Sequence, residues 1–225
     1  LISFDAESFQ ANLRQTNFFK SQYGLPQVDS LVKVVFLGRL YPDKGWDFTL
    51  DAFQTVSQQI DLTKVAIIVA GDGPMREEIA DKLKTLAPHV YLLGRISPEN
   101  VPALLMNCDL HVTTSEKETR GLTILEAFAA GIPVIAPCSG GVVENIDGNN
   151  GFLYTPGDRY NFTSKLKLLI ENSALRKQMG ERAKISVQGY SWDRSIQNLV
   201  NIWQEEIERK QMINEQQLLV NPEYN

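Results

Sequence analysis

The chain is poor in cysteine, and it lacks both an excess of positive charge and any long apolar run. Only two of its 225 residues are cysteines, Cys108 and Cys138, and each lies in or beside an apolar, strand-like run. Small buried thiols in a reducing compartment account for them better than a disulfide does. The formal net charge of -5 gives no support for non-specific nucleic-acid binding, which requires a basic surface.

No apolar stretch approaches the length of a membrane-spanning helix, and no secretory signal opens the chain. We therefore expect a cytoplasmic protein. With 43% hydrophobic and 22% charged residues, the composition is that of a globular protein long enough for one large domain. The sequence starts at Leu1 rather than at a methionine, which suggests a piece of something longer.

Short apolar runs alternate with amphipathic segments along most of the chain. The runs are rich in Val, Ile and Leu and are too continuous for strands with one exposed face, so they predict a parallel sheet covered on both faces. They are KVVFLGRL, KVAIIVAGDG, HVYLLGR, CDLHVTTS, IPVIAP and GFLYTP. Helix-like segments lie between them, over residues 46–59, 75–86, 98–107 and 121–130. This alternation predicts a doubly wound α/β sheet.

After Asp158 the pattern is helical only. It ends in a long helical segment over 192–212 and a polar tail over 213–225, which we expect to be frayed. Because no internal repeat or flexible linker divides the chain, we interpret it as one domain.

Glycines and cations recur where the predicted strands end. The first run ends in Gly38 and Arg39, the second reaches Gly73, and the third ends in Gly94 and Arg95. In such a sheet, ligands bind outside the carboxyl ends of the strands. A single glycine indicates only a tight turn, but recurrence at successive strand ends predicts a backbone that approaches a ligand closely.

Arg39 and Lys44 stand on the loop after the first strand, with a Pro-Asp turn between them. Such a pair can clamp a diphosphate, the guanidinium as a fork and the ammonium as a point charge. If a helix starts near Gly121, the free amides of Gly121, Leu122 and Thr123 form an anion site at its positive end. A diphosphate held between the two is physically coherent; two solvated loop cations are the alternative.

Two carboxylates, Glu118 and Glu126, flank this predicted helix start. Glu126 lies inside an otherwise apolar segment, and none of its helical neighbours could neutralise it. Because a carboxylate only accepts hydrogen bonds, a vicinal diol is its natural uncharged partner. We expect Glu126 to hold a nucleotide's ribose and Glu118 to face a transferred sugar. The alternatives are that Glu126 meets an arginine from a distant segment and that Glu118 is simply exposed.

The block from Glu118 to Glu126, followed by EAFAAGIPVIA and GGVVEN, resembles the retaining glycosyltransferases of family 4, which have the GT-B architecture. GRLYPDKG, VAGDGP and NNGFLY match that family's other blocks in the same order. The resemblance implies a single Rossmann-like doubly wound parallel sheet with helices on both faces and a helical C-terminal extension, which is one half of a GT-B fold. It also implies a hexosyltransferase-type enzyme that uses a nucleoside diphosphate sugar.

The resemblance assigns roles residue by residue. Arg39 and Lys44 match the positions that bind the donor diphosphate, Glu118 the one facing the donor sugar and Glu126 the one holding the ribose. Glu118, Arg39 and Lys44 are the expected catalytic residues. The residues expected to contact the donor are Gly38, Arg39, Lys44, Gly73, Gly94, Arg95, Glu118, Gly121, Leu122, Thr123 and Glu126. Gly94 and Arg95 stand where family members contact the base.

One departure from the family is Thr114, where proline is common; we expect it to affect loop shape more than chemistry. No Asp-x-Asp occurs, which fits the metal-independent GT-B class, so we expect no metal and no cofactor beyond a UDP-, GDP- or ADP-linked sugar substrate. Residues 1–30 resemble an interdomain linker and first helix, residues 31–212 the donor-binding domain, and 213–225 a frayed polar tail.

By the same resemblance, the acceptor-binding N-terminal domain is missing, so we expect the fragment to be inactive alone. Any membrane contact would then occur only through that missing domain. Two other functions stay open: a sugar-nucleotide epimerase of similar architecture, and a non-catalytic donor-binding subunit of a split transferase. The sequence leaves the base, the sugar and the acceptor open.

Overall fold

The computed structural model describes residues 6, 9, 14–188, 190 and 192–220. The chain divides into two units, each described here by itself. The larger unit, Ala6–Gln188, contains the whole sheet, and the smaller one contains the last helix. The start of the expected linker-like segment lies mostly outside the described residues.

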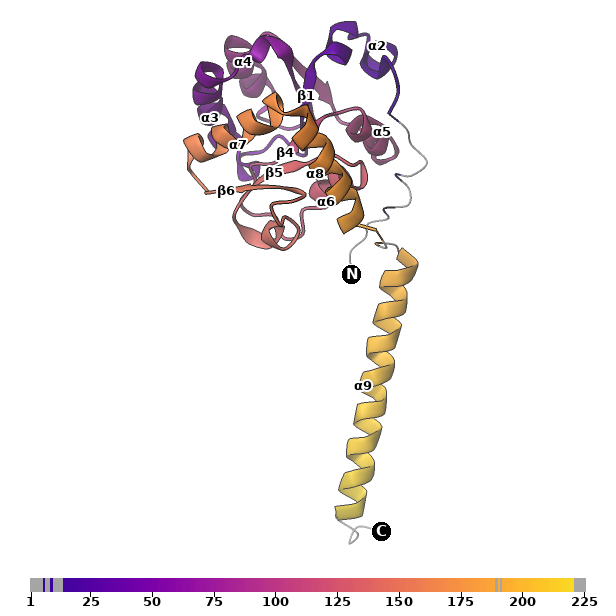
Figure 1. Ribbon diagram of the computed structural model, residues 1–225. Helices are drawn as coiled ribbons and strands as arrows, with labels where there is room; N and C mark the ends of the chain where they lie inside the picture. Colours follow the sequence, from indigo (N-terminus) through magenta and orange to yellow (C-terminus); the bar gives the residue numbers. More distant parts are fainter. Residues whose placement is uncertain (1–5, 7–8, 10–13, 189, 191, 221–225) are drawn as a thin grey trace. The chain divides into compact units, whose positions relative to one another are not determined.

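A six-stranded, all-parallel sheet forms the centre of the larger unit (Figure 1). Its strands are β1 (Val32–Leu37), β2 (Val65–Ala70), β3 (Val90–Gly94), β4 (Leu110–Val112), β5 (Val134–Pro137) and β6 (Gly151–Tyr154). Their order is β3-β2-β1-β4-β5-β6, the doubly wound order in which the direction of winding reverses between β1 and β4. Each predicted apolar run contains one of these strands, so the predicted fold class is confirmed.

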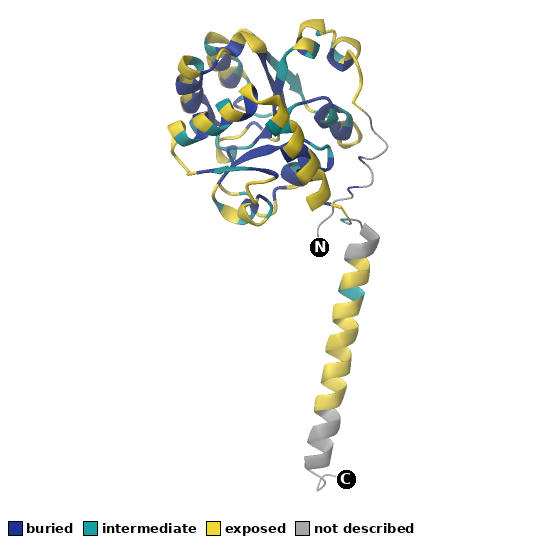
Figure 2. Cartoon of the chain, in the orientation of Figure 1, coloured by how far each residue is buried: buried dark blue, intermediate teal, exposed yellow. Residues whose placement is uncertain are grey.

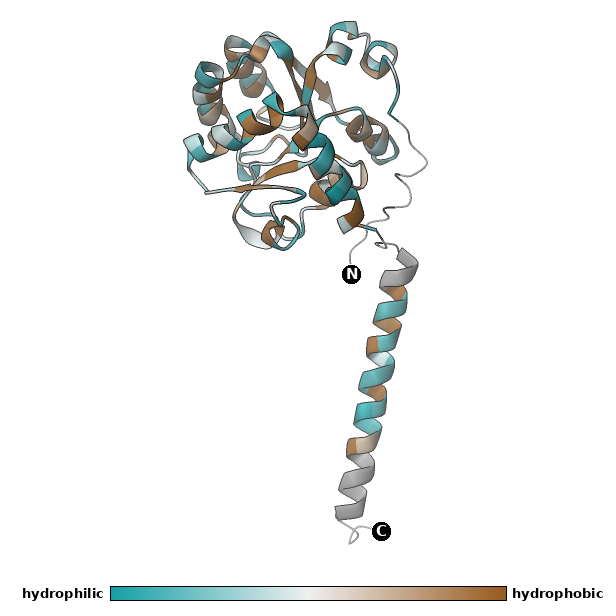
Figure 3. Ribbon diagram, in the orientation of Figure 1, coloured by the Kyte–Doolittle hydropathy of each residue, from teal (hydrophilic) through white to brown (hydrophobic). Residues whose placement is uncertain are grey.

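Helices cover both faces of the sheet (Figure 1). They include α2 (Phe18–Tyr23), α3 (Trp46–Gln59), α4 (Arg76–Leu86), α5 (Val101–Met106), α6 (Leu122–Ala129), α7 (Arg159–Glu171) and α8 (Ser173–Ser186). Helix α3 packs against α4 and α7, whereas α6 packs against α5 and α8. Figures 2 and 3 show the result, a buried and largely apolar sheet between helices whose outer faces are exposed and polar.

Side chains of each strand alternate between the two helical layers. Val34 and Phe36 of β1 belong to the core cluster under α3, α4 and α7. Val35 lies between them and is also fully buried, so it faces the opposite layer. On β4 the intervening residue is His111, the register partner of Val35. A histidine is therefore placed in the α6 layer of the core.

Two expectations about local structure need correction. The helix expected over 98–107 is divided into a 3-10 turn, Pro98–Asn100, and α5, because Pro102 has no N–H to continue a helical ladder. Cys138 is exposed rather than buried, since β5 ends one residue earlier. Cys108 is buried as expected.

The last helix, α9 (Trp192–Val220), is longer than the expected 192–212. Residues 213–220, which we expected to belong to a frayed tail, continue this helix, and residues 221–225 lie outside the described chain. The extra turns are rich in Glu, Gln and Leu, which favour helix, and the first proline comes only at position 222. No helix in the described part of the chain combines the length and apolarity needed to cross a bilayer.

Candidate functional site

Two loops lie side by side where β1 and β4 end. Val34 pairs with Leu110 and Val35 with His111, so the two strands end side by side. The loop after β1 carries Arg39 and Lys44, and the loop after β4 carries Glu118 and leads into α6. The direction of winding reverses between β1 and β4, and in sheets of this kind ligands bind at that switch point, outside the carboxyl ends of the strands.

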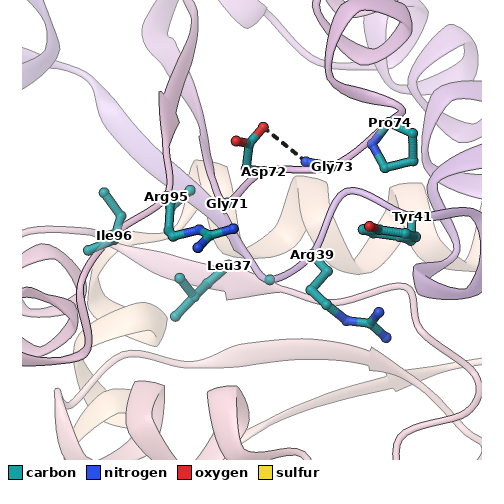
Figure 4. A pocket seen from close by; sticks show the side chains of 11 residues that line it. Leu37, Arg39, Tyr41, Gly71, Asp72, Gly73, Pro74, Arg95 and Ile96 are labelled. Atoms are coloured by element: carbon teal, nitrogen blue, oxygen red, sulfur yellow. Dashed lines mark hydrogen bonds between the residues drawn. The ribbon is translucent and has the colours of Figure 1, made fainter.

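An open pocket of about 630 Å³ lies over the ends of β1, β2 and β3 (Figure 4). It is lined by Leu37, Gly38, Arg39, Tyr41, Ala70, Gly71, Asp72, Gly73, Pro74, Arg95 and Ile96. Four of the expected donor-contacting residues, Gly38, Arg39, Gly73 and Arg95, are thus brought together. Gly94 directly precedes Arg95 but does not line the pocket itself. The volume is that of a typical small-molecule site.

Glycines make the floor of this pocket. A Cβ atom on Gly71 would overlap the carbonyl oxygen of Gly38, and one on Gly73 would overlap that of Leu40. Only glycine therefore allows the loops after β1 and β2 to pack this closely. The pocket lining combines the backbone of Gly38, Gly71 and Gly73 with side chains that include those of Arg39 and Arg95.

Arg39 stands at the mouth of the pocket with an exposed guanidinium. Its Nη2 lies 3.2 Å from Oδ2 of Asp43, and its guanidinium carbon lies 5.0 Å from the centre of the Tyr41 ring. An exposed ion pair of this kind contributes little stability, so Arg39 remains available to an anion. Arg95 has no ion pair within the described residues. Tyr41 was not predicted from the sequence, where nothing distinguishes it from any loop aromatic.

Lys44 of the loop after β1 contacts Glu118 of the loop after β4. Nζ of Lys44 lies 2.6 Å from Oε1 of Glu118, and the two side chains are 25% and 23% exposed. They come from loops that are 74 residues apart in the sequence. Both were predicted as site residues, but for different parts of a ligand, and their pairing was not predicted.

The backbone around Lys44 is held by a buried threonine. The Thr114 hydroxyl lies 3.1 Å from the carbonyl oxygen of Lys44, 3.0 Å from that of Gly45 and 2.8 Å from Oγ1 of Thr49. Gly45 has a φ of 76° and leaves no room for a Cβ beside the Thr114 carbonyl. Thr114, which stands where proline is common in the family, thus connects the loop after β1 to the end of β4 through its hydroxyl group.

The loop that carries Glu118 is anchored by the segment after β5. The amide of Gly141 donates to the Glu118 carbonyl at 2.9 Å, and Oγ of Ser139 donates to the carbonyl of Glu116 at 3.0 Å. Asn145 donates through Nδ2 to the Arg120 carbonyl at 2.9 Å. These supports hold the position of Glu118, and sequence reasoning had assigned none of them.

Helix α6 begins with free amides, as predicted. Gly121 precedes the helix with a φ of 62°, and its carbonyl accepts from the amides of Ile124 and Leu125. Within the described residues, the amides of Leu122 and Thr123 have no acceptor. Two unpaired N–H groups at the positive end of a helix form a site for an anion.

His111 connects the buried sheet to this helix start. Its Nδ1 lies 3.0 Å from the carbonyl oxygen of Val35 and its Nε2 lies 3.3 Å from Oγ1 of Thr123. Burial lowers the pKa of His111 to about 4, so the ring is neutral. Because a carbonyl only accepts, Nδ1 carries the proton and Nε2 accepts from the Thr123 hydroxyl. The sequence signal for this residue is one polar side chain within the fourth apolar run.

Glu126 has no counter-ion in the part of the chain that the structure describes. Within the described residues it makes no ion pair and no side-chain hydrogen bond, so the alternative of a distant arginine partner is not supported there. Burial raises the pKa of Glu126 to about 7. A largely buried carboxylate without a partner is suited to bind a ligand that donates hydrogen bonds.

The described residues contain no group of three or more His, Cys, Asp or Glu side chains that could hold a metal ion. The charged side chains at this edge of the sheet include Arg39, Arg95, Lys44, Asp43, Asp72, Glu118 and Glu126.

Comparison with known proteins identifies the family. Residues 22–186 match the family described as Glycosyl transferases group 1. The chain is 31% identical over 193 residues to the sulfoquinovosyl transferase SQD2 of Arabidopsis thaliana, covering 84% of this chain and 36% of that protein. It is 31% identical over 177 residues to the N-acetyl-alpha-D-glucosaminyl L-malate synthase of Bacillus anthracis, covering 77% and 45%.

Among solved structures, the chain is similar to Anabaena Alr3699/HepE in complex with UDP-glucose, with a TM-score of 0.75 and 26% identity. That match covers 90% of this chain and 56% of HepE. The chain therefore spans about half, or less, of the length of these relatives. The family match and the shared architecture together establish that the chain belongs to the group 1 family of GT-B glycosyltransferases.

Proposed function

We propose that this chain is the donor-binding domain of a retaining glycosyltransferase and that it binds a nucleoside diphosphate sugar at the carboxyl edge of its sheet. The observation that carries the proposal is the free start of α6, where the amides of Leu122 and Thr123 lack acceptors, at the same switch point as Arg39 and Lys44. The HepE complexes with UDP and UDP-glucose give further support.

Each part of the donor has a suitable partner. Arg39, Lys44 and the amides of α6 supply positive charge and donors for the diphosphate. The pocket near Arg95 receives the base, and Glu126 accepts hydrogen bonds from the ribose hydroxyls. Glu118 faces the transferred sugar.

The site favours transfer by stabilising the leaving group. In the reaction the bond between the sugar's anomeric carbon and the β-phosphate oxygen breaks, and both electrons stay on the phosphate. A hydroxyl oxygen of the acceptor forms the new bond to that carbon, and its proton passes to the departing β-phosphate oxygen. Cations and fixed N–H groups placed at the phosphate stabilise the charge that develops there.

The chain alone would bind the donor without transferring it. A transferase needs a second wall of the cleft to position the acceptor and exclude water. In the proposed whole protein, an N-terminal domain forms that wall. Measurable glycosyl transfer by the 225-residue chain would contradict this part of the proposal.

Calorimetric titration tests the donor class. The chain should bind at least one of UDP, GDP and ADP, and UDP is the first to test because HepE was solved with it. It should also bind the glucose derivative of the same nucleotide. A folded chain that binds none of these nucleotides would contradict the proposal.

A split transferase is the one alternative that an observation favours, because the chain covers only 36% to 56% of the relatives named above. The length of the native open reading frame separates a donor-binding subunit from a fragment. The epimerase alternative has lost support, since the family is one of glycosyltransferases.

A further inference from the structure

The ion pair between Lys44 and Glu118 occupies the place where both residues would meet a ligand. Within the described residues, neither side chain has another charged partner, and the 2.6 Å separation of Nζ and Oε1 is that of a strong charged hydrogen bond. Lys44 and Glu118 therefore neutralise each other. Any anion that recruits Lys44 has to compete with Glu118 for it.

Both partners are presented by anchored backbone. The hydroxyls of Thr114 and Thr49 hold the carbonyls next to Lys44, and the amide of Gly141 holds the carbonyl of Glu118 itself. The loops cannot drift apart easily, so Glu118 stays close to Lys44 even after the ion pair has been broken.

The two natural ligands of such a site differ in what they offer Glu118. A bare nucleoside diphosphate takes Lys44 and leaves the carboxylate beside a terminal phosphate of the same sign, which is unfavourable. A sugar nucleotide takes Lys44 as well, but its phosphates carry less charge and its sugar brings hydroxyl groups. Those hydroxyls can donate to the freed carboxylate.

We propose that Glu118 is a specificity-determining residue which, through Lys44, disfavours the bare nucleoside diphosphate relative to the sugar nucleotide. The inference rests on the proposed function. Its consequence is that the same carboxylate which receives the sugar also weakens binding of the nucleotide product once the sugar has left.

The experiment compares two ligands on matched variants of the 225-residue chain. The ligands are whichever of UDP, GDP and ADP binds most tightly and its glucose derivative. Glu118→Gln should bind the bare nucleotide about three- to tenfold more tightly than the unaltered chain, because Lys44 is released from its counter-ion. We define the preference for the sugar nucleotide as the Kd of the bare nucleotide divided by the Kd of the sugar nucleotide. In Glu118→Gln this ratio should fall by a larger factor than the factor by which the bare nucleotide binds more tightly.

Glu116→Gln is the matched control. Glu116 lies in the same loop, is exposed and makes no ion pair within the described residues, so its variant removes the same charge without touching Lys44. It should leave both Kd values within about twofold, the scale of a distant surface charge. An equal gain from Glu116→Gln would assign the effect to general charge and overturn the proposal.

Lys44→Gln completes a double-mutant cycle. If Glu118 acts through Lys44, the gain from Glu118→Gln should be smaller when Lys44 is already changed, because only the repulsion between the carboxylate and the terminal phosphate is then relieved. If Arg39 and Lys44 variants weaken nucleotide binding but Glu118→Gln leaves it equal or weaker, the specificity proposal fails while the donor site stands. If the folded, unaltered chain binds no nucleotide, both proposals fail.

Discussion

The buried imidazole of His111 accepts a hydrogen bond from Thr123, the second residue of α6, with 3.3 Å between Nε2 and Oγ1. The other ring nitrogen is held by the Val35 carbonyl of the neighbouring strand. A central strand is thereby linked to the helix start that we propose as the anion site. The link commits the Thr123 hydroxyl proton to the protein interior, so that only backbone amides of this segment can donate to a phosphate.

The first prediction is that His111 stabilises the fold only while it is neutral. Its pKa is lowered from 6.5 to about 4 in the folded chain, so the unfolded chain binds more protons between these values. Stability should therefore fall as the pH drops from about 6.5 to about 4, by up to about 3 kcal/mol. Urea unfolding of the unaltered chain and of His111→Asn should show a difference that shrinks over this range.

The only other histidine of the sequence, His89, provides the control. The effect of His111→Asn should be the same in a His89→Gln background as in the unaltered chain. A difference between the unaltered chain and His111→Asn that is constant from pH 7 to pH 4 would contradict the neutral, proton-accepting ring.

The second prediction concerns Glu126, whose titration has the opposite sign. Its pKa is raised from 4.5 to about 7 by burial, so the folded chain holds a proton that the unfolded chain has lost between these values. Stability from this group is lost as the pH rises from about 4.5 to about 7. Glu126→Gln should therefore be more stable than the unaltered chain at pH 8, by up to about 3 kcal/mol, and nearly equal at pH 4.

The same variant should bind nucleotides less well, by about 1–3 kcal/mol, because one acceptor oxygen becomes a donor. Thermal unfolding and calorimetry on the same samples measure the two effects. Glu144→Gln, an exposed change with no assigned ligand role, is the control. If Glu126→Gln gains no stability at pH 8 or keeps full affinity, the carboxylate is not held for a ligand.

The third prediction is that a chelator does not affect nucleotide binding, because cations of the chain and helix amides meet the diphosphate charge. Arg39→Ala should lose about 1.5–3 kcal/mol of nucleotide affinity in the presence of EDTA. Its effect on unfolding should be small, since the pair with Asp43 is exposed. Arg159→Ala removes an equally superficial pair with Asp51 and should leave affinity unchanged. An absolute requirement for Mg²⁺ would contradict this view of the site.

The fourth prediction is that the Thr114 hydroxyl supports phosphate binding. Thr114→Val keeps the shape but leaves buried polar groups of Lys44, Gly45 and Thr49 with fewer partners, at a cost of about 1–3 kcal/mol in stability. Nucleoside diphosphate should bind more weakly, whereas uridine, which has no phosphate, should be unaffected. Thr114→Ser should restore both properties. A loss that is equal for uridine and UDP would indicate a general disturbance of the fold.

Most of the fold could be predicted from the sequence, because the local hydrophobic pattern agrees with the tertiary structure. Continuous apolar runs became buried parallel strands, and α3 begins and ends where its pattern predicts. The hydrophobic pattern predicted the helix bounds wrongly in two places. Pro102 interrupts a helix that hydrophobic spacing favoured, and residues 213–220 continue the last helix beyond the end that the pattern predicted.

For the site, the sequence identified the residues but not their contacts. Glycines and cations at successive strand ends lie together because all the strands are parallel and end at one edge. The pairing of Lys44 with Glu118 depends on the side-by-side position of β1 and β4, which are separated by β2 and β3 in the sequence. The contact between His111 and Thr123 depends equally on the packing of α6 on the sheet. Spacing along the chain contains no information about either distance.

The most direct test of the central claim is the amide NMR spectrum of the 225-residue chain during titration with UDP in EDTA. The largest shifts should occur at the amides of Leu122 and Thr123, which gain an acceptor, and at Gly38 and Arg39 on the facing loop. Arg39→Ala should reduce the shifts at α6 by weakening the same complex. UDP binding that shifts amides elsewhere, and leaves Leu122 and Thr123 unchanged at saturation, would contradict the account.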